Sequence, residues 1–110
     1  MSVQHKELAA GRWQTLSFVA QMGNVGSEVE RTMLWRAKAN ADYSAKALER
    51  ALELLDLTIA DARNRGRLRE LTRVREALVD YFCADNQFGS SDASWRTYFN
   101  AFAWAARAGR

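Results

Sequence analysis

Apolar residues recur every three or four positions along almost the whole chain, the spacing that gives a helix one apolar face. In the first third of the chain, successive steps of four, three, four and four residues join Phe18, Met22, Val25, Val29 and Met33. This pattern predicts a first helix from Arg12 to Lys38. No proline occurs in the 110 residues. Because proline costs about 3 kcal/mol inside a helix, its absence favours long helices.

Three further helices are predicted, separated by short polar connections. The second runs from Asn40 to Asp61, with the asparagine as its N-cap. The third covers Arg67 to Ala84, and the fourth begins near Asp92, directly after the N-cap candidate Ser91. In the second connection, Gly66 is expected to supply a left-handed C-cap conformation.

These helices predict an all-α fold: a single four-helix bundle, up-down and antiparallel, with a long first helix. A chain of 110 residues suits one domain, residues 1–110, and 48% of them are hydrophobic. A core is therefore expected without disulfides or metal. Residues 1–10 show little periodicity, and we expect a frayed tail there.

Catalytic and metal chemistry is hard to assemble from this composition. The chain has one histidine, His5, and one cysteine, Cys83, whereas a zinc site needs about four nitrogen or sulfur ligands. The sequence contains neither a Glu-x-x-His pair nor a glycine-rich phosphate loop. We therefore expect no catalytic residue, no metal and no cofactor, and a protein that is not an enzyme.

Two absences bear on the location of the chain. The sequence has no run of 18 apolar residues, so no membrane-spanning segment is expected. A single cysteine forms no internal disulfide, and a reducing cytoplasm is then the simplest compartment.

Positive charge is concentrated in one segment. The net charge is only +3, yet six arginines fall within 13 residues: Arg63, Arg65, Arg67, Arg69, Arg73 and Arg75. Such a cluster suits phosphates or the carboxylates of a partner. The alternative is pairing inside the chain, since Glu70 lies three residues before Arg73, and Glu76 lies two turns after Arg69.

A carboxylate interrupts the apolar face of the first helix. Glu28 lies between apolar positions and is expected to be half-buried in an ion pair, with Arg31 or with an arginine of another helix. A functional carboxylate is the alternative, but structural pairing is the commoner role of such a residue.

Four residues are candidates for a subunit interface: Gly23, Gly26, Trp35 and Trp104. Each glycine costs about 1 kcal/mol relative to alanine in a helix, which suggests a flat patch for a closely approaching helix of this chain or of another subunit. Trp104 lies off the apolar stripe of the last helix. Four tryptophans in so short a chain favour a homo-oligomer.

Two short stretches carry a resemblance to a known family. Residues 24–28 are Asn-Val-Gly-Ser-Glu, similar to an Asn-Ile-Ala-Glu-Gly stretch, and residues 50–55 are similar to a later Leu-Glu-containing segment. Residues 17–55 thereby resemble the small four-helix-bundle proteins encoded in 23S ribosomal RNA intervening sequences. The resemblance implies an up-down bundle, ring-forming oligomers and, for some relatives, nucleic-acid binding. Here Glu28 is displaced by one position and the following glycine is absent.

Two hypotheses of function follow. The first is a non-enzymatic interaction module that self-associates through an apolar and aromatic surface. The alternative is a nucleic-acid-binding accessory protein that uses the arginines from Arg63 to Arg75. An enzyme using Glu28 with Arg31 or Arg36 is the least favoured hypothesis, because no acid–base set accompanies them.

Overall fold

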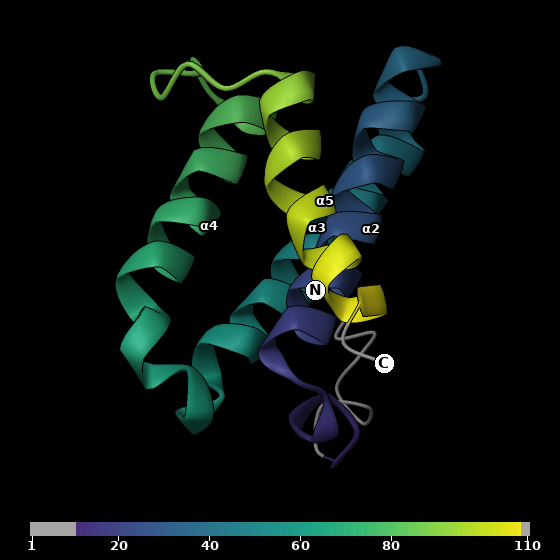
Figure 1. Cartoon of the computed structure of the whole chain (residues 1–110). Helices are drawn as coiled ribbons and strands as arrows, with labels where there is room; N and C mark the ends of the chain where they lie inside the picture. The colour runs from purple at the N-terminus through teal and green to yellow at the C-terminus, as the bar shows by residue number, and fades with distance from the viewer. Residues whose placement is uncertain (1–10, 109–110) are drawn as a thin grey trace.

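The computed structural model describes residues 11–108, and in this part of the chain every regular element is helical. Four long helices alternate in direction (Figure 1): α2 (Phe18–Ala37), α3 (Ala41–Ala60), α4 (Leu68–Cys83) and α5 (Asp92–Ala108). Two short 3-10 helices precede α2 and α4: η1 (Trp13–Thr15) and η2 (Ala62–Arg67). The predicted all-α, up-down four-helix bundle is confirmed. The predicted tail, residues 1–10 with His5, lies outside the described residues.

The first helix begins later than the apolar spacing predicts. Leu16 is extended, with φ −81° and ψ 145°, and Ser17 caps α2 by accepting the Ala20 N–H on its Oγ at 3.1 Å. The predicted continuous helix from Arg12 is therefore wrong at its start. The break lets the preceding 3-10 helix fold back, so that Trp13 Nε1 donates to Thr58 Oγ1 of α3 at 3.2 Å.

Both predicted N-caps are confirmed. The Asn40 side chain accepts the Tyr43 N–H at 3.0 Å and so satisfies a donor in the first turn of α3. Ser91 and Ser94 cap α5 reciprocally: Ser91 Oγ accepts the Ser94 N–H at 3.0 Å, and Ser94 Oγ accepts the Ser91 N–H at 2.9 Å. Each cap is a local contact within four residues, which is why the sequence predicts it.

The prediction for Gly66 is wrong. Positive φ occurs in the described residues at Ala39, Asn86 and Gly89, and not at Gly66. Gly66 belongs to the 3-10 helix η2, whose backbone is right-handed throughout and which continues directly into α4. Gly89 instead supplies the left-handed glycine, in the connection between α4 and α5.

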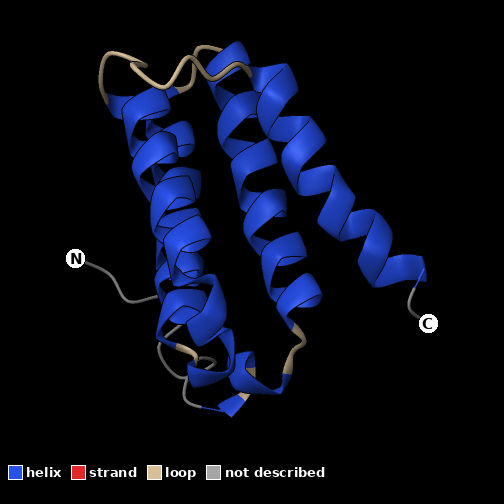
Figure 2. Ribbon diagram, turned by 60° about the vertical axis from the view of Figure 1, so that its left-hand side comes forward, coloured by secondary structure: helices blue, strands red, loops and turns tan. Residues whose placement is uncertain are grey.

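Helix α2 packs along both α3 and α5, while α4 packs on α3 and reaches α5 through long side chains. Figure 2 shows the helices side by side, with the described loops at their two ends. The core takes apolar residues from all four helices, including Met22, Val25, Val29, Met33, Ala51, Leu55, Leu71, Leu78, Trp95 and Phe99.

Gly26 allows the close approach of α5 to α2. A Cβ atom placed on Gly26 would lie 2.7 Å from the Cβ of Phe99, closer than two carbon atoms pack. At Gly23, one turn earlier, a Cβ would meet no atom within 4 Å. The neighbour that Gly26 accommodates is therefore a helix of its own chain.

Candidate binding surfaces

Two of the six arginines in the arginine-rich segment form ion pairs with aspartates of the same chain. Arg63 Nη2 pairs with Asp61 Oδ2 at 2.6 Å and also donates to the Leu16 carbonyl at 2.7 Å. Arg75 Nε pairs with Asp56 Oδ1 at 2.7 Å. Arg63 and Arg75 therefore fasten η2 and α4 to the rest of the bundle.

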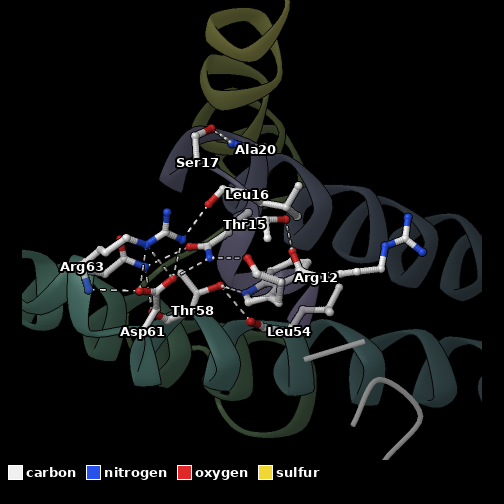
Figure 3. A network of polar contacts seen from close by, with 12 residues as sticks. Arg12, Thr15, Leu16, Ser17, Ala20, Leu54, Thr58, Asp61 and Arg63 are labelled. Atoms are coloured by element: carbon white, nitrogen blue, oxygen red, sulfur yellow. Dashed lines mark hydrogen bonds and ion pairs between the residues drawn. The ribbon is translucent and has the colours of Figure 1, made fainter. Parts of the chain in front are cut away.

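Asp61 is the centre of a buried polar network at one end of the bundle. Its carboxylate accepts from Gln21 Nε2 at 2.9 Å, while Asn64 Nδ2 donates to Gln21 Oε1 at 2.9 Å and to the Thr58 carbonyl at 2.9 Å. Gln21, Thr58, Asp61 and Asn64 are all less than 5% exposed. Figure 3 shows Arg63 reaching over Asp61 toward Leu16.

The charge of Asp61 is stabilised by its donors. Hydrogen bonds from Arg63, and then from Gln21, hold the pKa of Asp61 well below its ordinary value of 3.8, although burial alone would raise it. A carboxylate that accepts this many hydrogen bonds stays ionised and is not a proton donor near neutral pH. The network joins α2, α3 and η2 and has a structural role.

The predicted pairs within the arginine-rich segment, Glu70 with Arg73 and Arg69 with Glu76, are not among the ion pairs of the described residues. Glu70 instead accepts the Tyr98 hydroxyl of α5 at 2.7 Å. Burial, and then this hydrogen bond, raise the pKa of Tyr98 above its ordinary value of 10.0. This hydrogen bond makes Glu70 part of the contact between α4 and α5.

The other four arginines of the cluster form no ion pair within residues 11–108. Arg67 lies over the Phe18 ring, 4.2 Å from its centroid, and Arg73 lies 5.4 Å from the centroid of the Phe88 ring. Arg65 and Arg69 are exposed. The part of the cluster that remains accessible to a ligand is therefore smaller than the sequence suggests.

The predicted Glu28–Arg31 pair is present, and a second arginine shares it. Arg31 Nη1 donates to Glu28 Oε2 at 3.0 Å, and Arg50 Nε of α3 donates to Oε1 at 3.3 Å. Glu28 is 9% exposed, whereas the Arg31 side chain is 58% exposed. The contact of Glu28 with Arg50 therefore joins α2 to α3, while Arg31 lies on the solvent side of Glu28.

A groove of about 390 Å³ lies beside this pair, between α2 and α3, and is lined by Arg31, Trp35, Tyr43, Lys46 and Arg50. The Trp35 and Tyr43 rings meet edge to face, with centroids 4.8 Å apart. Lys38 Nζ lies 5.3 Å from the Trp35 centroid and Lys46 Nζ lies 5.7 Å from the Tyr43 centroid. We call this the basic-aromatic groove. Trp35 is one of the predicted interface residues, whereas the groove itself is not apparent from the sequence.

A second groove, of about 340 Å³, runs between α2 and α5 and includes Gly23 and Gly26. Arg96 lines it and forms a bidentate pair with Glu30, in which Nε donates to Oε1 at 3.0 Å and Nη2 donates to Oε2 at 3.0 Å. Trp95 also lines it, and its buried indole N–H has no acceptor among the described residues. Trp104 lies on the outer side of α5 and is 64% exposed.

Within residues 11–108 no helix is both long and apolar enough to cross a membrane. The same residues contain no group of three or more His, Cys, Asp or Glu side chains that could hold a metal ion. Cys83 is exposed at the end of α4.

Comparison of the chain with protein-family models, with curated proteins and with solved structures gives no significant match. The resemblance of residues 17–55 to the intervening-sequence proteins therefore stays a prediction.

Proposed function

We propose that this chain is a non-enzymatic interaction module that self-associates through the C-terminal end of α5. The observation that carries the proposal is the run Ala-Phe-Ala-Trp-Ala-Ala at residues 101–106, in which the indole N–H of Trp104 is the one polar side-chain group. A helix that is apolar all round is normally covered on all sides. In this structure Ala101, Trp104 and Ala105 of that run are exposed.

The inner side of this run is already occupied within the chain. Phe102 meets Phe18 of α2 edge to face, with centroids 5.7 Å apart, and Ala106 is half-buried beside it on the same helix face. Packing against α2 thus fixes the orientation of α5 and directs Trp104 away from the bundle. An exposed tryptophan on a rigid helix is the kind of side chain that dominates protein interfaces.

A second copy of the chain is the partner we propose. In a two-fold symmetric dimer the same patch contributes from both subunits, so one apolar helix end is enough to cover itself. The buried carboxylate of Asp61 does not argue for catalysis, because Arg63 and Gln21 donate hydrogen bonds to its two oxygens. Such a group is not available to a substrate.

Replacing Trp104 with lysine is expected to dissociate the dimer. Loss of a central interface tryptophan typically costs at least 2 kcal/mol, so the dissociation constant should rise by about 30-fold or more. Sedimentation equilibrium of both proteins measures the change. Leu34→Lys is the matched control, since Leu34 is 48% exposed on α2 and lies outside the α5 run. Equal association of Trp104→Lys and the wild-type chain would rule out this interface.

Nucleic-acid binding through the arginine cluster is the second candidate function. It is favoured by the exposure of Arg65 and Arg69, which form no ion pair within the described residues. The nearby carboxylate of Glu70 accepts a hydrogen bond from Tyr98 instead. Guanidinium groups without a carboxylate partner are available to phosphate oxygens.

Arg69→Glu is expected to weaken binding of single-stranded RNA or DNA and to reduce the slope of log affinity against log salt by about 1. Fluorescence anisotropy of a labelled oligonucleotide, titrated at several salt concentrations, measures both effects. Arg75→Gln is a useful comparison, because Arg75 is held by Asp56 and should contribute less to the slope. If the wild-type chain binds no oligonucleotide at about 50 mM salt, this second function is eliminated.

A further inference from the structure

The basic-aromatic groove carries more positive charge than its surroundings neutralise. Arg31 and Arg50 both donate to Glu28, at 3.0 and 3.3 Å, so one carboxylate serves two guanidinium groups. Lys46, at the mouth of the groove, has no carboxylate within 4.0 Å among the described residues. Three cations therefore surround the groove against one anion.

Nearby acidic residues on α3 leave Lys46 without an ion pair. Asp42 and Glu49 lie one turn before and after Lys46, yet neither forms an ion pair with it. Lys38, in the connection that follows α2, adds a fourth cation beside the Trp35 ring. An anion in the groove would be attracted to all four cations, and the attraction would weaken as salt is added.

The groove also offers flat aromatic surface. Tyr43 is 50% exposed, and the neighbouring Trp35 is partly exposed. Lysine side chains lie over both rings, and such long exposed chains move aside at little cost when a planar group stacks in their place. At about 390 Å³ the groove is in the size range of small-molecule sites.

We propose that the basic-aromatic groove binds a nucleoside polyphosphate. The phosphates lie on Lys46 and on the N–H groups of Arg31 and Arg50 that Glu28 does not occupy, since each of the two arginines donates a single N–H to Glu28. The base stacks on the face of the Trp35 ring, and Tyr43, whose ring is perpendicular to that of Trp35, borders the base. This site is independent of the α5 run and of the arginine cluster, so its presence or absence leaves the proposed self-association untouched.

Calorimetric titration of the full chain with ADP, pyrophosphate and adenosine at about 50 mM salt tests the proposal, because salt near that level screens the groove only partly. We expect ADP to bind most tightly, pyrophosphate more weakly and adenosine least. Lys46→Glu should weaken ADP and pyrophosphate by about tenfold or more, and Lys46→Gln by less. Trp35→Leu should weaken ADP and leave pyrophosphate unchanged.

Arg12→Glu is the matched control, because it reverses one exposed charge that precedes η1 and lies outside every surface proposed to bind a ligand, and it should leave ADP binding unchanged. Circular dichroism of each variant establishes that the helices are retained. The proposal is overturned if ADP does not bind the wild-type chain, or if Arg12→Glu weakens ADP binding as much as Lys46→Glu does. Equal affinity for ADP and pyrophosphate, unaffected by Trp35→Leu, would also overturn it by removing the base from the site.

Discussion

Replacing Gly26 with leucine is expected to lower the free energy of unfolding by about 3 kcal/mol or more, since overpacking a close contact costs about 1–3 kcal/mol even for smaller additions. A Cβ at this position lies 2.7 Å from Phe99 Cβ and 3.0 Å from two atoms of its ring. The Cβ of Phe99 is fixed to the backbone of α5, so no side-chain rotation removes the clash. The two helices would have to move apart.

At Gly23, one turn before Gly26, adding a Cβ is expected to have the opposite effect on the free energy of unfolding. A Cβ there meets no atom within 4 Å, and alanine is favoured over glycine in a helix by about 1 kcal/mol. Gly23→Ala should therefore raise the free energy of unfolding, whereas Gly26→Ala should lower it. Urea unfolding followed by circular dichroism measures both changes. Equal stabilisation by the two alanines would contradict the close approach of α5 to α2.

The second large effect is expected at Asp61. Asp61→Ala should lower the free energy of unfolding at pH 7 by about 3 kcal/mol, because several hydrogen bonds to a charged acceptor are lost together. Gln21 is fully buried and would lose the acceptor of one of its amide protons. The N-cap contact between the Asp61 side chain and the Arg63 N–H, at 3.0 Å, would also disappear.

The effect of Asp61 on stability should depend on pH in a defined direction. Its pKa in the folded protein lies below the ordinary value of 3.8, so the unfolded chain takes up its proton first as the pH falls. The stabilisation is then fully present above about pH 5 and decreases steadily as the pH falls below about 4. Unfolding of the wild-type chain and of Asp61→Asn should therefore differ most at neutral pH. An equal difference at pH 7 and at pH 2 would show that the charge of Asp61 is not what stabilises the network.

The parts of the fold that depend on local contacts were predictable from the sequence. Apolar periodicity located four helices, and Asn40 and Ser91 marked two N-caps because a cap involves residues only three apart. The break at Leu16 was not predictable in this way. It depends on Ser17 capping α2 and on Trp13 reaching Thr58, 45 residues away in the sequence.

The surfaces were harder to predict because their charges pair across helices. The sequence places Glu70 near Arg73, but the fold turns Glu70 toward Tyr98. Likewise, the partner of Arg75 is Asp56, which lies 19 residues earlier on α3. Closeness along the chain therefore predicts a partner for Arg73 that the structure does not show, and it does not reveal the partner of Arg75.

One signal in the sequence would have found the basic-aromatic groove. Trp35 and Tyr43 lie four residues on either side of Ala39, the residue with φ 60° that joins α2 to α3. In an antiparallel helix pair with so short a connection, residues equally distant from the turn lie side by side. An aromatic pair placed symmetrically about a predicted turn, with lysines nearby, indicates a shared surface.

Amide hydrogen exchange at several protein concentrations tests most directly the claim that a second copy of the chain covers the apolar end of α5. We expect exchange across residues 101–108 to slow as the protein concentration rises from about 1 µM to about 100 µM, while exchange on the outer face of α4 stays constant. Exchange at residues 101–108 that is the same at every concentration would contradict the claim.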